Sequence, residues 1–308
     1  MENPRLFVWQ YRISLTVIAS VLSFFAGLSL PVHRSITPKI ASSISQPKDH
    51  NSSVQNRSNL KVGIGQQQDI YKKAIAQLKQ EQAKRLNFAV PAQFQGKTLR
   101  DVQLKDGRKT IALTFDDGPW PHTTSQVLNI LKKQNIKATF FVVGRNVKNY
   151  PHIMKQVVKD GHAIGNHTWH HQYHNYSPGA AARELNDTAA LIYKVTGVKT
   201  SLFRPPAGIL TNGLTAYAHQ KKYAVIMWSV DSQDWQARNA TPKAMSDSIV
   251  KNTKPGGIIL LHDGGGDRTK TVQALPLLIA ELKKQGYQFV TVPQLLEMQN
   301  KELQAMKG

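Results

Sequence analysis

One segment of the sequence, GNHTWHHQYHNY at residues 165–176, contains four histidines, and histidine is the commonest protein ligand for transition metals. In a helix all four would share one face, because they stand at i, i+3, i+4 and i+7: His167, His170, His171 and His174. Two pairs have the i,i+4 spacing that brings imidazoles together, His167 with His171 and His170 with His174. The spacing alone does not choose between them.

Two adjacent carboxylates, Asp116 and Asp117, end the run TIALTFDD and are followed by Gly and Pro. Consecutive side chains at a strand end point in different directions, so one carboxylate could bind a metal ion while the other faces a bound substrate. Asp-Asp-Gly-Pro is also common turn chemistry. Taken alone, this motif therefore favours an ordinary turn.

Three further apolar runs end in polar groups that could do chemistry. Arg204 precedes two prolines in FRPPAG, which would stiffen its loop, and His262 lies two residues beyond Leu260 and so on the same strand face. The third group, DSQDW, combines two carboxylates with an indole: Asp231, Asp234 and Trp235. Each group has an ordinary structural explanation, but so many at successive strand ends rarely arise by packing alone.

Short β-branched runs and helical patterns alternate over roughly 190 residues and would position these groups. This alternation predicts an α/β fold with parallel strands and crossover helices, either a barrel or an open sheet. In both, function gathers at the C-terminal strand ends. The runs read as strands are TIALTFD, ATFFVVG, HAIGNH, TSLFRP, YAVIMWSVD and GIILLHD.

The N-terminal segment, residues 1–31, has the pattern of a membrane anchor. Arg5 and Arg12 precede an uncharged run from Ile13 to Leu30. Its 18 residues suit a bilayer span better than a secretory signal, whose apolar region is roughly 7–15 residues long. The flanking arginines would stay in the cytoplasm and send the rest outward. A cleaved signal is the alternative.

Four further regions follow from composition. Residues 32–65 are polar and predict a flexible linker; residues 66–104 predict a helical and extended lead-in; residues 105–300 hold the catalytic motifs; residues 301–308 form a tail. Within the lead-in, an apolar stripe predicts a helix from Gln66 to Leu86 that packs on or leads into the domain: Tyr71, Ala74, Ile75 and Leu78.

Composition narrows the chemistry and the partners. The chain has no cysteine, so thiolate nucleophiles and thiolate metal sites are excluded, and a metal must be held by His, Asp or Glu. The formal charge of +21 would attract an anionic polymer, lipid or nucleic acid equally well. No zinc-finger spacing or basic-aromatic cluster is present, so no nucleic-acid partner is expected.

Five motifs together resemble, in the same order, those of the polysaccharide deacetylases, the carbohydrate esterases of family four. They are T-F-D-D-G-P at 114–119, H-T-x-x-H at 167–171, R-P-P-x-G at 204–208, D-x-x-D-W at 231–235 and L-x-H-D at 260–263. The resemblance covers about residues 105–300. It implies a distorted (β/α) barrel of seven or eight strands with one catalytic divalent ion.

The resemblance implies that Asp117, His167 and His171 hold this ion. One carboxylate and two imidazoles leave positions open for water and substrate, as in a catalytic zinc site. Zinc is the expected ion, and the same ligands permit cobalt, nickel or manganese.

The resemblance also assigns the proton transfers. Asp116 would be the general base, held ionised and oriented by Arg204. His262 would be the general acid that protonates the departing amine, and Asp231 would keep it protonated and aligned.

Three residues are implied for substrate binding. The backbone N–H of Ala207 would stabilise the oxyanion, and Trp235 with Leu260 would enclose the acetyl methyl group. Ala207 stands where relatives often have an aromatic residue, and Gln172 stands where many have proline.

The expected function is a membrane-anchored, extracytoplasmic, metal-dependent N-deacetylase of an N-acetylhexosamine polymer, with peptidoglycan as the preferred substrate because a basic surface complements an anionic wall. Within the same fold, an O-acetyl esterase acting on xylan or another wall glycan is the alternative. An inactive wall-binding module and a 2-His-1-carboxylate iron oxygenase are weaker alternatives: no presumed catalytic position holds an inert residue, and an oxygenase has no use for Asp116, Arg204 and His262 together.

Overall fold

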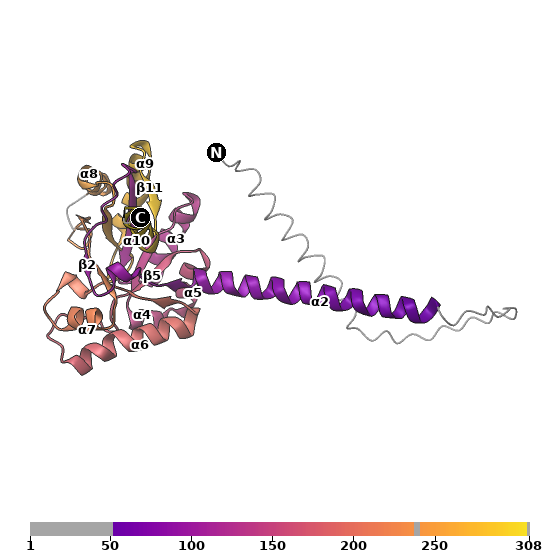
Figure 1. The fold of residues 1–308 in the computed structure, drawn as a ribbon. Helices are drawn as coiled ribbons and strands as arrows, with labels where there is room; N and C mark the ends of the chain where they lie inside the picture. Colours follow the sequence, from indigo (N-terminus) through magenta and orange to yellow (C-terminus); the bar gives the residue numbers. More distant parts are fainter. Residues whose placement is uncertain (1–51, 237–240, 307–308) are drawn as a thin grey trace, which may run out of the picture. The chain divides into compact units, whose positions relative to one another are not determined.

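The centre of the protein is a curled parallel sheet, seen in a computed structural model that describes residues 52–236 and 241–306, with side chains from residue 68 onward (Figure 1). All of its strand pairings are parallel. Its nine strands lie in the order β2 (Thr98–Leu99), β8 (Ala224–Ile226), β7 (Leu202–Phe203), β5 (Ala163–Asn166), β4 (Thr139–Val142), β3 (Thr110–Asp116), β10 (Ile258–His262) and β9 (Val230–Asp231), with β11 (Gln288–Val290) pairing with β3.

Helices connect these strands, and several begin with the residues that favour helix starts. Ser177, Thr241 and Thr291 each accept a hydrogen bond from a backbone N–H of the first turn, and a proline stands in each of those first turns. The helices are α3 (Thr123–Lys133), α4 (Gly144–Asn149), α5 (Pro151–Lys159), α6 (Pro178–Thr196), α7 (Leu214–Gln220), α8 (Pro242–Asn252), α9 (Thr269–Lys284) and α10 (Val292–Ala305). Shorter elements are the pair β1 (Asn87–Phe88) with β6 (Lys199–Thr200) and the turns η1 (Ala92–Phe94) and η2 (Pro206–Gly208).

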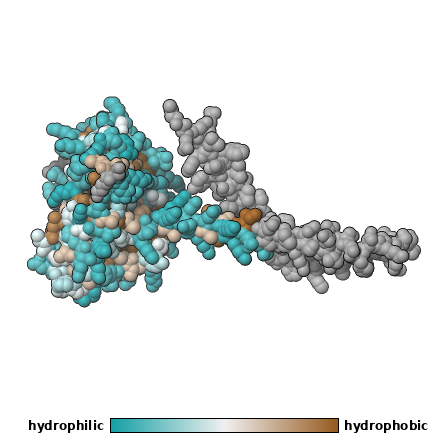
Figure 2. Space-filling view, in the orientation of Figure 1, coloured by the Kyte–Doolittle hydropathy of each residue, from teal (hydrophilic) through white to brown (hydrophobic). Residues whose placement is uncertain are grey.

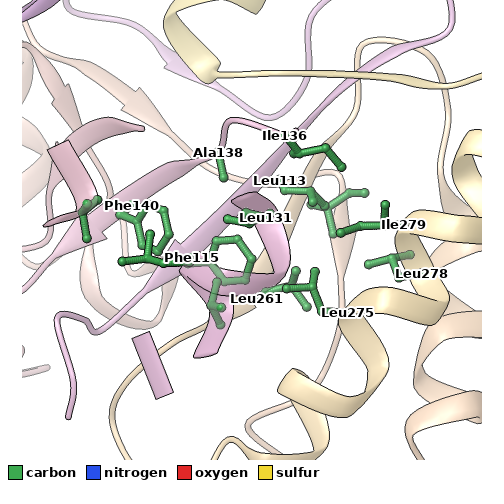
Figure 3. Packing of buried hydrophobic residues seen from close by; sticks show 14 of the residues in the cluster. Leu113, Phe115, Leu131, Ile136, Ala138, Phe140, Leu261, Leu275, Leu278 and Ile279 are labelled. Carbon is green, nitrogen blue, oxygen red and sulfur yellow. The ribbon is translucent and has the colours of Figure 1, made fainter. Parts of the chain in front are cut away.

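The middle strands are buried on both faces, which is why they read as apolar runs rather than alternating patterns. On one face, Phe115 stacks on Phe140 with ring centroids 5.1 Å apart, and α3 and α9 cover them with Leu131 and Leu275 (Figure 3). The opposite face has its own apolar cluster, with Phe141 among its residues. This double burial holds the strand ends, and so the site, on a rigid base.

The predicted α/β fold with parallel strands is confirmed, but the strand number differs from seven or eight. The sheet has nine strands because two-residue segments such as β2, β7 and β9 take part in it. Among the described residues β2 and β9 are its edges and do not pair with each other, so the hydrogen-bonded sheet is curled but open.

The lead-in helix α2 (Ser52–Arg85) starts earlier than the predicted Gln66, so residues 52–65, predicted as linker, are helical. The prediction relied on an apolar stripe, which marks only helices that bury a face. From residue 68 onward all side chains of α2 are exposed, including Ile75 and Leu78 of that stripe. From residue 68 to Arg85 the helix is exposed and runs directly into β1 of the domain.

The predicted membrane segment, residues 13–30, lies outside the described residues. Within the described ranges, every helix is too short or too polar to span a bilayer. The visible surface of the domain is largely hydrophilic (Figure 2).

Candidate active site

A pocket of about 690 Å³ lies where the C-terminal strand ends meet. Every residue predicted for the site lines it except Arg204, which is fully buried. Strand register explains the grouping, because His262 of β10 pairs with Asp116 of β3, and Leu260 pairs with Asp231 of β9. Three aromatic residues and two arginines that sequence reasoning did not single out also line the pocket: Trp120, Tyr173, Trp228, Arg145 and Arg268.

The candidate metal ligands converge on one oxygen. Oδ1 of Asp117 lies 3.1 Å from Nε2 of His171 and 3.6 Å from Nε2 of His167. Ligand atoms of all three residues lie within 4.8 Å of one another, and Oδ1 of Asp117 is buried without a hydrogen bond in the described part of the chain. A buried oxygen without a partner, facing two imidazoles, fits a bound cation.

Backbone conformation and neighbouring groups position these ligands. Asp117 has a left-handed φ of 75°, which aspartate tolerates better than most residues, and its carbonyl accepts a hydrogen bond from Asn146 Nδ2 at 2.7 Å. His167 follows β5, and its Nδ1 lies 2.6 Å from the carbonyl of Arg204. That carbonyl can only accept, so Nδ1 carries the proton and Nε2 is free to bind a metal.

Burial lowers the pKa of His167 to about 3, so its imidazole is neutral near pH 7. A metal ligand must be neutral in this way.

The two histidine ligands are joined by a turn, not by a helix. Residues 167–173 are non-helical, and Thr168 and His171 have φ values of 68° and 56°. The ambiguity between the two histidine pairs is thereby resolved. His170 lies 2.7 Å from Glu184, and exposed His174 stacks on Tyr176, so neither belongs to the ligand cluster.

Asp116, the candidate base, is paired with a buried arginine as predicted. Its Oδ1 lies 2.7 Å from Nη1 of Arg204, and its Oδ2 lies 3.7 Å from Nε2 of His167. Arg204 also donates to Thr114 Oγ1 and to the carbonyls of Ile226 and Met227, which fixes the guanidinium. Burial raises the pKa of Asp116, and the charge of Arg204 opposes that rise.

The partner of His262 is Asp234, and the prediction of Asp231 is wrong. Asp234 Oδ1 lies 2.6 Å from His262 Nδ1, and its Oδ2 accepts from the backbone N–H of His262 and from Thr271. Asp231 instead ends β9 and accepts from the backbone N–H of Gln233 at 2.8 Å. Gln233, with a left-handed φ of 54°, turns the chain so that the second acid of the motif reaches the histidine.

Asp234 controls the charge of His262. Burial favours the neutral imidazole, but the hydrogen bond and negative charge of Asp234 outweigh it and raise the pKa of His262 to about 9. Burial also raises the pKa of Asp234, and the bonds to His262 reverse that effect and lower it. The geometry thus keeps a protonated imidazole beside the pocket near pH 7.

The predicted substrate-binding residues all line the pocket but differ in exposure. Leu260 is buried, whereas the Trp235 side chain is 52% exposed and so is not a core residue. Ala207 has a left-handed φ of 52° within η2, after the two prolines that follow Arg204.

Sequence reasoning included Asp263 in the L-x-H-D motif but assigned it no role. This carboxylate is buried and accepts from Thr124 Oγ1 at 2.6 Å, and burial raises its pKa to about 7. A Cβ added to Gly118 would collide with its oxygens. Its position directly after His262 was the available signal.

Comparisons with known proteins identify relatives of this chain. The polysaccharide deacetylase family profile matches residues 103–226. A peptidoglycan-N-acetylglucosamine deacetylase of Bacillus cereus is 43% identical over 197 residues, which cover 63% of this chain and 91% of that protein. The peptidoglycan-N-acetylmuramic acid deacetylase PdaC of Bacillus subtilis is 39% identical over 200 residues, 65% of this chain and 41% of that protein.

A solved structure has a similar fold. The Bc1960 peptidoglycan N-acetylglucosamine deacetylase, in complex with 4-naphthalen-1-yl-N-oxidanyl-benzamide, is 32% identical and superposes with a TM-score of 0.61 over 66% of this chain and 94% of that one. The fold, the order of the motifs and these similarities together show that this chain belongs to the polysaccharide deacetylase family.

Proposed function

We propose that this chain is a metal-dependent hydrolase that removes the N-acetyl group from N-acetylglucosamine residues of peptidoglycan. The observation that carries the proposal is the buried oxygen of Asp117 without a hydrogen bond, facing two imidazoles, next to a carboxylate that Arg204 holds in place. The choice of N-acetylglucosamine rests on the relatives, because the N-acetylglucosamine deacetylase of Bacillus cereus is 43% identical to this chain and the N-acetylmuramic acid deacetylase PdaC is 39% identical.

Asp117, His167 and His171 would hold the metal ion. Their nitrogen and oxygen ligands suit zinc first, and also cobalt, nickel or manganese. When bound, such an ion lowers the pKa of water and polarises a carbonyl oxygen.

Asp116 takes the proton from the attacking water. Its carboxylate faces the same space as the metal ligands, with Oδ2 directed toward His167 and Oδ1 fixed by Arg204. A burial-raised pKa makes the carboxylate a stronger base, while the bond to Arg204 keeps its orientation constant. The water oxygen then bonds to the amide carbon.

His262 supplies the proton that the leaving nitrogen needs. An amide nitrogen is a poor leaving group until it is protonated, and the raised pKa of His262 keeps a proton available. As the C–N bond breaks, that proton moves from Nε2 to nitrogen, giving the free amine and acetate. Asp234 binds Nδ1 and so directs Nε2 toward the pocket.

A short acyl group fits the wall formed by Leu260 and Trp235, and the Ala207 N–H is the proposed donor to the oxyanion. The inactive-module alternative is disfavoured because the base, the acid and their buried partners are all present and paired. We keep the O-acetyl esterase as an outcome of the test below.

We also propose that residues 1–31 anchor the protein in the membrane and that the catalytic domain, residues 105–300, works outside the cytoplasm, where peptidoglycan lies. The apolar run at residues 13–30 and the preceding arginines support this proposal. Protease accessibility of the domain in intact cells tests it, and a protected domain would contradict it.

Acetate release tests the function. The full chain, stripped of metal and reloaded with zinc or cobalt, is given peptidoglycan, chitin oligomers, poly-N-acetylglucosamine or acetylxylan. We expect acetate from peptidoglycan, loss of activity on chelation and recovery on reloading. Release from acetylxylan alone would favour the esterase, and no release from any substrate would contradict the proposal.

A further inference from the structure

The turn between the two histidine ligands is held in an unfavourable backbone conformation. Thr168 and His171 both have left-handed φ values, 68° and 56°, although neither is glycine. For a β-branched residue such as threonine this conformation is rare. It persists only where surrounding contacts determine it, so the groups that bind this turn determine where His171 lies.

The backbone N–H groups of residues 168–171 all donate to side chains. The N–H of Thr168 donates to Asn166 Oδ1, and that of His171 donates to Thr168 Oγ1. The two N–H groups between them, of Trp169 and His170, both donate to one carboxylate oxygen, Oε2 of Glu184, at 2.8 and 2.9 Å. The carbonyl groups of Thr168 and Trp169 accept from the backbone N–H groups of Gly144 and Arg145 at the start of α4. Of these six hydrogen bonds, the two at the centre of the turn depend on a single side chain, that of Glu184.

Glu184 is well suited to hold a loop in place. It is buried, with 8% of its surface exposed, and its second oxygen accepts from His170 Nδ1 at 2.7 Å. It stands on α6, which Ser177 caps and which Asn166 ties to the end of β5 through the carbonyl of Leu185. The carboxylate is therefore attached to a rigid element, and it is not among the residues that line the pocket.

The two histidine ligands differ in what orients them. The ring of His167 is fixed by its own hydrogen bond to the carbonyl of Arg204. Among the described residues His171 Nδ1 makes no hydrogen bond, so the direction of its ring follows from the turn and from packing against His167 and Tyr173. The distance from His171 Nε2 to Asp117 Oδ1 consequently depends on the backbone that Glu184 holds.

We propose that Glu184 is the positioning residue of the metal site: by accepting the two central N–H groups of the 167–171 turn, it sets His171 and thereby metal affinity, without touching metal or substrate. This inference rests on the metal-dependent function proposed above. It gives α6 a role in metal binding, although α6 lies outside the H-T-x-x-H motif that contains the histidine ligands.

Two variants of nearly equal size separate hydrogen bonding from packing. Glu184→Gln retains an oxygen for both N–H groups, and His170 can switch tautomer to accept from the amide, so this variant should retain most of the affinity. Glu184→Met fills similar space but accepts nothing. The matched control is Asp187→Asn, an exposed carboxylate on the same helix, which should bind like the wild type.

The measurements use metal-free full-length protein. Zinc affinity is obtained by competition with a chromophoric chelator, the cobalt form is examined by visible absorption, and thermal unfolding of the metal-free proteins reports on folding. We expect Glu184→Met to bind zinc about 10–100-fold more weakly, the range seen when partners of metal ligands are removed, and to change the cobalt spectrum. Glu184→Gln should retain most of the wild-type zinc affinity and the wild-type cobalt spectrum.

Equal zinc affinity and an unchanged cobalt spectrum in Glu184→Met would overturn the inference, as would an equal loss in Asp187→Asn. If Glu184→Met does not fold, Glu184→Ser replaces it with the same expectation. Wild-type protein that bound neither zinc nor cobalt would instead contradict the proposed metal dependence, so the two failures are distinguishable.

Discussion

Asp234 and His262 form the closest pair of opposite charges at the rim of the pocket, with 2.6 Å between Oδ1 and Nδ1. Asp234 is buried and also bonds to the backbone N–H of His262 and to Thr271, so both of its oxygens are used. A carboxylate held in this way both stabilises the imidazolium and fixes the direction of its ring.

The first prediction concerns the pH dependence set by this pair. His262 is an acid only while protonated, and its raised pKa, about 9, keeps it protonated up to that pH. Asp234→Asn removes the charge that raises the pKa, so the alkaline limb of kcat/KM should move to lower pH. At pH 8 the rate of acetate release should fall by at least about tenfold. The complete loss of general acid catalysis typically lowers a rate by more than this.

The control for this prediction is Asp231→Asn. Asp231 lines the pocket without bonding to His262, so its removal should leave the alkaline limb where it is. A shift with Asp231→Asn and none with Asp234→Asn would reverse the assignment.

The second prediction separates proton abstraction from metal binding. Asp116→Asn should lower kcat by about 10²–10⁴-fold, because an amide cannot take a proton from water. Asp116 is not one of the three clustered ligands, so zinc affinity measured by calorimetry should change little. An active Asp116→Asn enzyme would refute its role as base.

The third prediction compares the four histidines. His167→Ala and His171→Ala should abolish zinc binding and activity, since each removes one of three ligands. His170→Ala and His174→Ala should leave zinc binding largely intact, because neither ring faces Asp117. Titration of each metal-free variant with zinc gives the answer, and strong binding by His171→Ala would contradict the assigned ligand set.

The fourth prediction concerns stability in acid and a histidine outside the pocket. Burial lowers the pKa of His162 to about 4, and its Nδ1 accepts from the backbone N–H of Ala138. The unfolded chain takes up this proton near pH 6.5, so folding free energy is lost as the pH falls from there toward 4. The loss due to this residue can reach about 3 kcal/mol.

His162→Asn keeps an acceptor for Ala138 but cannot be protonated. Urea unfolding at pH 7 and pH 4.5 should show a smaller drop in stability for this variant than for the wild type. An equal drop would mean that other groups account for the acid sensitivity.

Strand positions were predictable because each buried strand is an apolar run with a polar end. TIALTFD is the whole of β3, and the run GIILLHD contains β10, so Asp116 and His262 were placed correctly at strand ends. That these two strands are neighbours is a finding of the structure. The carboxyl ends of parallel strands lie at the same edge of the sheet, so residues at these ends come together independently of the loop conformations.

Loop geometry was not predictable in the same way. The prediction took the first aspartate of DSQDW, Asp231, as the partner of His262, but the left-handed turn at Gln233 brings the second, Asp234, to that histidine. Glu184 accepts a hydrogen bond from a residue of the 167–171 turn that lies 14 positions earlier in the sequence, and no local sequence pattern predicts such a contact. The start of α2 was missed because the sequence of residues 52–65 has no apolar periodicity.

Arg204 bonds to both halves of the site. Its guanidinium binds the base Asp116, and its carbonyl orients the metal ligand His167. When the end of β7 moves in thermal motion, base and ligand are carried along together, so the distance between them varies less than the position of either. Arg204 thus couples the position of the candidate base to that of one candidate ligand, so a change at this one residue would disturb proton transfer and metal binding at once.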